Sequence, residues 1–172
     1  MSVPAFIRPA EPDDWRGIWP ILRDVAAAGD TFTYAIDLDE PRGADLWSKG
    51  NGPSQIFVAL DDALNILGSA KVGANHAGPG GHVATASFIV APSARGVGVG
   101  RALLDAVLAW ANAVGFEAMQ FNAVAATNEA AVSLYRSAGF AIVGEIPAAF
   151  RHPARGYVSL LVMYRRFERS LE

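Results

Sequence analysis

The sequence predicts an α/β domain of three layers, in which helices flank a mixed central sheet. The chain has 172 residues, of which 52% are hydrophobic, and this suits one domain, residues 1–172, with ample apolar content for a core. Seven short apolar segments have the character of strands, and four segments repeat apolar residues at helical spacing. Strands and helices alternate only in the second half, which predicts a mixed sheet rather than a regular parallel one.

The first half of the chain is expected to hold an N-terminal strand, a helix and then a strand hairpin. The helix begins around Pro12 and ends at Gly29, and the hairpin turns at Asp61-Asp62. Residues 31–53 look irregular apart from one short helix. The expected strands cover 5–8, 55–60 and 64–72, and the expected helices cover 12–28 and 44–49.

The second half reads as strand, helix, strand, helix and two closing strands. Gly115 and Gly139 follow the two helical patterns and are suited to end them. The segment 147–156 is expected to be a loop between the last strands. The expected strands cover 83–90, 118–124, 140–146 and 157–164, and the expected helices cover 99–114 and 127–137.

Composition excludes several classes of protein. A formal net charge of −3 and a pI near 5.6 argue against a nucleic-acid surface, which needs a basic face. The chain has no cysteine, and its three histidines lack a metal-ligand spacing, so no metal site is expected. The stretch 102–111 is too short to span a membrane. The N-terminus lacks the pattern of a signal peptide, which predicts a cytoplasmic protein.

The segment from Phe88 to Arg101 (FIVAPSARGVGVGR) carries the clearest chemical signal. An apolar strand leads into a turn with three alternate glycines, and a helix follows at once. Backbone N–H groups at a helix start bind phosphate oxygens, and glycines let the backbone approach them closely. Arg95 and Arg101 add positive charge beside this turn. A flexible loop before a helix is the plainer interpretation, and the flanking strand and helix count against it.

Other phosphate-binding motifs fit less well. A P-loop, GxxxxGK[ST], is absent. A dinucleotide fingerprint needs glycine where this chain has Arg101, and Pro92 separates the glycines from the strand. A nucleotide-dependent oxidoreductase is therefore a weak alternative.

These residues resemble the GCN5-related N-acetyltransferase (GNAT) superfamily. Arg95, Gly98 and Gly100 match its central motif [R/Q]-x-x-G-x-[G/A]. A second motif, N-x-x-A-x-x-[L/F]-Y-x-x-x-G-F, is matched in full by Asn128, Ala131, Leu134, Tyr135, Gly139 and Phe140. The resemblance covers nearly the whole chain and implies the acyl-CoA N-acyltransferase fold, with acetyl-CoA as cosubstrate and a cofactor core at about 83–140.

The resemblance also implies roles for residues of that core. Backbone groups of Phe88, Ile89 and Val90 would pair with the pantetheine arm as an extra strand would, across a bulge within Thr85–Ser87. Asn128 would bind the same arm, and Tyr135 would lie beside the thioester sulfur. The full set implied for coenzyme A is Phe88, Ile89, Val90, Arg95, Gly96, Val97, Gly98, Val99, Gly100, Arg101, Asn128, Ala131 and Tyr135.

The pattern of residues 82–88, with Phe121-Asn122 before Asn128, is similar to fungal acetyltransferases that act on proline analogues such as azetidine-2-carboxylate. The chain would then be a bacterial relative of these enzymes. In them, asparagines on two central strands help to hold the substrate. Asn122 matches one of them, whereas Thr85 stands where another asparagine is expected.

The implied reaction is direct attack of an amine on the acetyl thioester, which requires the amine to lose a proton. A neutral phenol can protonate the leaving sulfur, and by its motif position Tyr135 is the candidate acid. Packing against the sheet is the alternative role for its ring. No acidic residue lies in 83–90, so the general base stays open: Thr85 or Ser87 could hold a relay water, or the amine could arrive deprotonated.

The acceptor amine is expected to bind between segments 11–53 and 147–157. Asp30 could bind an ammonium there or merely cap the preceding helix. Arg151 could pair with an acceptor carboxylate, and Asn122, on an apolar strand, needs a polar partner that a ligand would supply. The candidate acceptor residues are Asp30, Phe32, Tyr34, Thr85, Asn122, Arg151 and Tyr157.

We therefore predict an acetyl-CoA-dependent N-acetyltransferase acting on a primary or secondary amine of a small molecule, with amino acids among the candidates. A non-catalytic acyl-CoA-binding module and an acetyltransferase of protein lysines or N-termini are the alternatives. At the level of the superfamily, a homodimer is expected.

Overall fold

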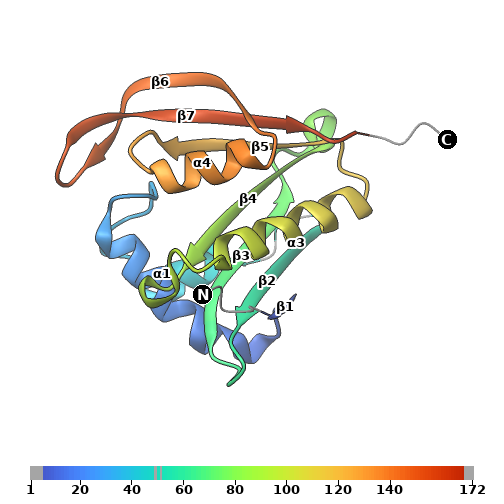
Figure 1. Cartoon of the computed structure of the whole chain (residues 1–172), viewed down its shortest axis with the longest axis vertical. Coiled ribbons are helices and arrows are strands. Elements are labelled where there is room, and N and C mark those ends of the chain that lie inside the picture. The colour runs from blue at the N-terminus through green and yellow to red at the C-terminus, as the bar shows by residue number, and fades with distance from the viewer. Residues whose placement is uncertain (1–5, 49, 51, 169–172) are drawn as a thin grey trace.

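The computed structural model describes residues 6–48, 50 and 52–168, and these form one seven-stranded sheet with helices on both faces (Figure 1). The predicted α/β class and the mixed sheet are confirmed. The strands lie in the order β1-β2-β3-β4-β5-β7-β6. Their bounds are Phe6–Pro9 (β1), Ser54–Leu60 (β2), Ile66–Ala74 (β3), Val83–Val90 (β4), Ala118–Ala125 (β5), Ala141–His152 (β6) and Gly156–Arg166 (β7).

All neighbouring strands pair antiparallel except β4 and β5, which run parallel. This parallel pair is short, because only Val83 with Ala118 and Ala84 with Met119 are in register. Beyond Ala84, β4 stays paired with β3 while β5 follows β7. The two strands therefore diverge in the middle of the sheet, which Figure 1 shows as β4 turning away from β5.

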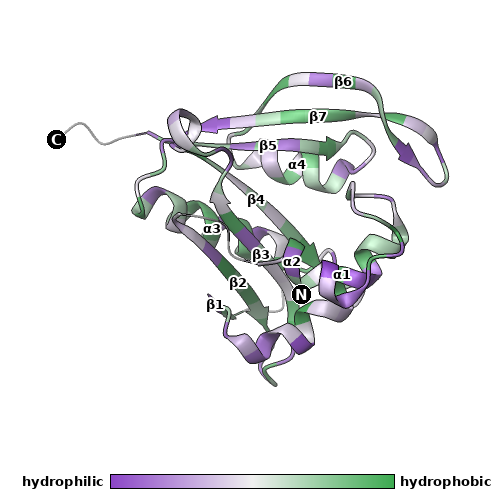
Figure 2. Cartoon of the chain, turned by 180° about the vertical axis from the view of Figure 1, so that it is seen from behind, coloured by the Kyte–Doolittle hydropathy of each residue, from purple (hydrophilic) through white to green (hydrophobic). Residues whose placement is uncertain are grey.

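Two apolar cores hold the helices to the sheet. Helices α3 (Val99–Ala113) and α4 (Glu129–Ser137) cover one face, where Leu104 and Met119 are fully buried. Helices α1 (Trp15–Ala28) and α2 (Glu40–Leu46) cover the other, around Leu22 and Ile89. Figure 2 shows β2 as largely hydrophobic, whereas the far end of the β6–β7 hairpin carries hydrophilic residues.

Polar contacts fix the end of α2 on the sheet. The Trp47 indole N–H donates to Ser69 Oγ at 3.0 Å, and Ser69 Oγ donates to the Phe57 carbonyl at 2.8 Å. The Lys71 ammonium donates to the Leu46 carbonyl and lies 5.8 Å from the Trp47 ring centroid. Burial lowers the pKa of Lys71. Each polar group here therefore has a partner although Trp47 and Ser69 are fully buried.

The short helix of the first half begins earlier than predicted. It covers Glu40–Leu46 rather than 44–49, and Lys49 lies outside the described residues. The Asp39 side chain accepts from the Arg42 N–H at 3.0 Å and caps the first turn, which contains Pro41. An acidic cap followed by proline in the first turn is a start signal that outweighs the weak apolar spacing after it.

The segment 147–156, expected to be a loop, is mostly strand. β6 runs to His152, and only residues 153–155 form the turn into β7. An irregularity between Ile146 and Phe150, with Ala148 at a φ of 52°, accommodates Pro147. β6 is an edge strand of the sheet, where a proline without an N–H and a bulge are tolerated.

The bulge expected within Thr85–Ser87 is not there. β4 pairs with β3 in unbroken register from Ala84 to Val90. The register shift lies instead in β5, between Phe121 and Val124, where β5 pairs with β7. A bulge bends the strand that carries it, so the divergence of β4 and β5 is accompanied by a distortion of β5.

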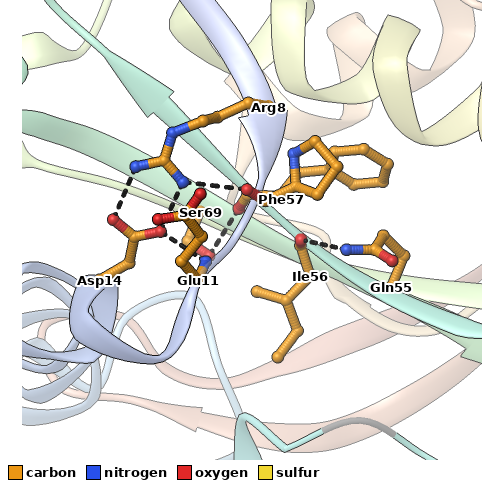
Figure 3. A network of polar contacts seen from close by, with 8 residues as sticks. Arg8, Glu11, Asp14, Gln55, Ile56, Phe57 and Ser69 are labelled. Atoms are coloured by element: carbon orange, nitrogen blue, oxygen red, sulfur yellow. Dashed lines mark hydrogen bonds and ion pairs between the residues drawn. The ribbon is translucent and has the colours of Figure 1, made fainter.

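An ion pair holds the entry to α1 against β1. The Arg8 guanidinium donates to both oxygens of Asp14, at 2.6 and 2.9 Å (Figure 3). Asp14 also accepts from the Glu11 N–H at 2.7 Å. The hydrogen bond from Arg8 is the largest contribution that lowers the pKa of Asp14, with burial acting in the opposite direction.

We predict that Asp14→Asn lowers the free energy of unfolding by about 1 kcal/mol near neutral pH, because it removes a bidentate, partly buried pair. The folded pKa of Asp14 is lowered, so this stabilisation is present above the unfolded pKa of about 3.9 and is lost as pH falls through the folded pKa. Urea unfolding at neutral and acidic pH measures both effects. Asp13→Asn, at an exposed neighbour, is the control, and equal losses in the two variants would contradict the prediction.

Candidate active site

A cavity of about 1020 Å³ lies where β4 and β5 diverge. Its wall includes Phe88, which packs with the core under α3 and α4, and Ile89, which packs with the core under α1 and α2. Neighbouring residues of a strand point to opposite faces. The cavity therefore passes through the sheet and is bordered by helical elements from both faces.

The glycine turn brings backbone N–H groups to one side of this cavity. Gly96 and Gly98 have φ values of 76° and 97°, a left-handed conformation that glycine adopts without strain. Gly98 is the N-cap of α3, and the first helical bond joins the Ala102 N–H to its carbonyl. The N–H groups of residues 99–101 are thus outside the hydrogen bonds of the helix, and the helix dipole favours an anion there.

The two arginines beside the turn differ in their partners. Arg101 donates through Nε to both oxygens of Asp105, at 2.9 and 3.0 Å, and is thus partly neutralised. Arg95 is exposed, borders the cavity, and forms no ion pair with any residue from 6 to 48 or from 52 to 168. Arg95 is therefore the cation of this turn that is available to an anionic ligand.

The start of α4 reaches the cavity from β5. The Asn128 side chain accepts from the Ala131 N–H at 3.2 Å and caps the helix. Thr127, also in the wall, has a buried Oγ1 without a hydrogen-bond partner. A buried hydroxyl without a partner is costly, so this position suits a ligand that can donate or accept a hydrogen bond.

The position of Tyr135 is compatible with both roles weighed from the sequence. Its ring packs 4.2 Å from the Phe121 centroid and 6.2 Å from that of Phe88, and Tyr135 also borders the cavity. In the part of the chain that the structure describes, no protein group hydrogen-bonds its hydroxyl. Burial raises the pKa of the Tyr135 phenol well above its ordinary value. The residue is therefore a neutral proton donor at any pH near neutrality.

The segment after α1 supplies the opposite wall. Phe32 and Tyr34 stack with ring centroids 4.9 Å apart. Burial raises the pKa of Tyr34, and a hydrogen bond with Ser87 on β4 opposes part of this shift. Asp30, at the end of α1, has one buried carboxylate oxygen, Oδ1, without a partner. The wall here is thus aromatic with one acidic group.

Asn122 is exposed, contrary to the expectation of a buried amide. Its amide nitrogen donates to Asn75 Oδ1 at 2.6 Å, and its Oδ1 accepts from Gln120 Nε2 at 2.7 Å. The residue borders the cavity, yet protein amides already satisfy it. The apolar pattern of β5 suggested burial. At Asn122, however, the strand has already diverged from β4, so no neighbouring strand covers it on that side.

Most of the predicted site residues meet in this one cavity. For coenzyme A these are Phe88, Ile89, Val90, Arg95, Gly96, Gly98, Gly100, Arg101, Asn128, Ala131 and Tyr135; for the acceptor they are Asp30, Phe32, Tyr34, Thr85 and Asn122. Val97, Val99, Arg151 and Tyr157 are outside the wall: Val99 is buried in the core, and Arg151 and Tyr157 are exposed on the outer hairpin.

Sequence reasoning missed several residues of the wall, among them Thr127 and Arg155. Residue 127 was expected only as the first residue of the helix 127–137, and the burial of its hydroxyl was not visible from local sequence. Arg155 was not predicted because the segment 147–156 was expected to be a long loop, in which Arg151 was the candidate. The tight turn at residues 153–155 places Arg155, four residues later, at the cavity instead.

Fold and site together define an acyl-CoA-dependent transferase: diverging parallel strands, a helix start at the glycine turn and a tyrosine in the same cavity. Residues 19–140 match the family model described as "Acetyltransferase (GNAT) family". The chain therefore belongs to the GNAT family. None of the described helices has the length and apolarity that crossing a bilayer requires.

Individual relatives agree with this assignment. N-acetyltransferase aca1 of Schizosaccharomyces pombe is 33% identical over 121 residues, which cover 70% of this chain and 57% of that protein. A mycothiol acetyltransferase of Propionibacterium freudenreichii is 37% identical over 106 residues, 60% of this chain and 33% of that protein. The chain thus spans little more than half of the first relative and a third of the second.

Solved structures match over nearly the full length. A GCN5-related N-acetyltransferase from Kribbella flavida has a TM-score of 0.91 and 47% identity, covering 95% of this chain and 98% of that one. A phosphinothricin acetyltransferase from Sinorhizobium meliloti, solved in complex with AcCoA, has a TM-score of 0.82 and 24% identity, covering 95% and 88%. The second likeness shows the shared fold.

We predict that Gly96→Ala weakens binding of acetyl-CoA about tenfold, the effect of losing one hydrogen bond to a charged group. A Cβ at Gly96 meets no protein atom within 4 Å, but the positive φ of 76° is unfavourable for alanine. The turn therefore shifts, and its N–H groups no longer point toward the phosphates of the cofactor. Isothermal titration measures the dissociation constant.

Gly115→Ala is the matched control, because Gly115 has a φ of 97°, is equally free of contacts and follows the other end of α3. Both variants should lose about 1 kcal/mol of stability, and only the first should lose affinity. Equal affinity of the two variants would show that the turn does not hold the cofactor.

Proposed function

We propose that this chain transfers an acetyl group from acetyl-CoA to a primary or secondary amine of a small molecule, with Tyr135 as general acid. The observation that carries the proposal is the single cavity that passes through the sheet from the glycine turn to the segment after α1. Such a cavity lets a cofactor enter from one face and an amine from the other. The GNAT family match supports the acetyl donor.

The residues present fit coenzyme A. The N–H groups at the start of α3 and the Arg95 guanidinium suit its phosphates. The edge of β4 from Phe88 to Val90 that faces the cavity suits the amides of the pantetheine arm, and Thr127 Oγ1 is a polar atom that needs a partner. Acetyl-CoA supplies a thioester, whose carbonyl carbon an amine can attack.

Tyr135 is proposed to donate one proton in the reaction. As the new C–N bond forms and the C–S bond breaks, the phenol donates its proton to the leaving sulfur. Its raised pKa keeps it protonated in the resting state, and its aromatic neighbours Phe88 and Phe121 hold the ring in place. An acceptor that arrives as an ammonium gives one proton to solvent before it attacks, and the nitrogen gives up a second proton once the C–N bond has formed. The Tyr135 phenolate then recovers a proton from solvent, since water has access to the exposed residues of the wall.

The general base remains open between two groups. Ser87 is engaged with Tyr34, and Thr85 borders the cavity beside it; either hydroxyl could hold a relay water. A homodimer and a cytoplasmic location stay predictions. The alternative of a non-catalytic acyl-CoA-binding module has one specific point in its favour, the absence of an acidic base on β4.

The function is tested by mixing the protein with acetyl-CoA and a panel of small amines, including amino acids and a lysine peptide, and following release of free thiol. Thiol release that depends on the amine, with an acetylated product in mass spectrometry, is the expected result. Binding of coenzyme A without acetylation of any amine would favour the binding module, and absence of binding would overturn both.

We predict that Tyr135→Phe lowers kcat by about 10²- to 10⁴-fold, the range of a general acid, while the dissociation constant for acetyl-CoA changes less than about twofold. The ring that packs on Phe121 is retained, so folding should be unaffected. Tyr164→Phe, at a half-buried tyrosine of β7, is the control. Because the pKa of Tyr135 is raised, this acid should not limit kcat below about pH 10. Full activity of Tyr135→Phe would exclude the role.

A further inference from the structure

Asp30 has a carboxylate oxygen that lacks a donor. Gly29, with a φ of 62°, ends α1 and turns the chain into the cavity wall. Asp30 Oδ1 is buried there without a hydrogen bond, and in the described residues the only other buried side-chain polar atom in this state is Thr127 Oγ1. Thr127 belongs to the side of α4, whereas Asp30 belongs to the side of α1. The acceptor side therefore needs a donor that the protein does not supply.

Arg155 brings a positive charge to the same cavity from the β6–β7 turn. The backbone N–H groups of Ala154 and Arg155 both donate to His152 Nδ1, at 3.1 and 3.2 Å, so the turn is held by a side chain that also borders the cavity. Among residues 6–48 and 52–168, no acidic group forms an ion pair with Arg155. Figure 1 shows this end of the hairpin near the segment between α1 and α2.

We infer that the acceptor is a zwitterion: an amine that also carries an acid group, with its ammonium received by Asp30 and its acid group by Arg155. An ammonium supplies several N–H donors to an oxygen that has none, and a guanidinium matches a carboxylate in both charge and shape. This inference rests on the proposed acetyl transfer and adds which class of amine the cavity selects. Arg155 thereby takes the role that the sequence suggested for Arg151.

The zwitterion also decides between the acceptors left open above. A lysine side chain of a protein brings an ammonium but no acid group beside it, so Arg155 would stay unmatched. A simple alkylamine has the same deficit. Preference for a small acid-bearing amine is therefore a consequence of two charges contributed by segments at opposite ends of the chain.

The test compares the amino acids from glycine to 6-aminohexanoate, together with proline, against n-alkylamines of equal chain length. The wild type should acetylate at least one amino acid with a kcat/KM about tenfold or more above that of the matched alkylamine. Arg155→Gln should lower that kcat/KM by about ten- to a hundredfold and leave the value for the alkylamine unchanged. Arg151→Gln, on the same hairpin but outside the wall, should change neither.

Asp30→Asn should lower kcat/KM for amino acids and alkylamines alike, because both carry the ammonium, without changing the dissociation constant for acetyl-CoA. Asp37→Asn, at an exposed aspartate of the same segment, is its control. If alkylamines react as well as every amino acid, or if Arg155→Gln slows both equally, the inference is overturned and acetyl transfer stands. If acetyl-CoA is not bound, or no amine is acetylated, the proposed function fails as well.

Discussion

The parting of β4 from β5 is the constraint on which the site depends. After two paired positions, Val83 with Ala118 and Ala84 with Met119, the strands no longer share hydrogen bonds. β4 keeps β3 on one side, so its other edge from Thr85 to Val90 faces the cavity. Backbone N–H and C=O groups inside a protein need partners. An edge left open in the centre of a sheet is stable only if water or a ligand occupies it, and an extended arm with amide groups can pair with it as a strand would.

The parallel direction of these two strands explains why both helix starts lie at the same cavity. Parallel strands end at the same edge of a sheet, and here each strand leads directly into a helix: β4 through the glycine turn into α3, and β5 through Thr127 and Asn128 into α4. Both helices therefore direct their N-terminal N–H groups, and the positive ends of their dipoles, toward the diverging strands. An antiparallel pair would have placed one helix start at the far edge.

Local sequence was sufficient to predict those parts of the site that lie within one continuous segment. The turn from Pro92 to Gly100 and the start of α4 at Asn128 were predictable, because glycine at a positive φ and an asparagine cap act over a few residues. Arg155 and the exposure of Asn122 were not, since they depend on which strand lies beside β6 or β5. The position of the register shift in β5, rather than β4, depends likewise on pairing with β7, which no local pattern encodes.

The unpartnered atoms of the wall connect the stability of the chain with its ligands. In the rest of the chain that the structure describes, buried side-chain polar atoms have hydrogen-bond partners. Ser69, for example, accepts from Trp47 and donates to the Phe57 carbonyl. Asp30 Oδ1 and Thr127 Oγ1 lack such partners, and they lie on the two sides of the sheet that one cavity joins. Leaving a buried acceptor unsatisfied costs about 1–3 kcal/mol, a cost that ligand binding removes. Each side of the cavity thus favours its own polar ligand, and the sheet brings the two ligands together only where its central strands part.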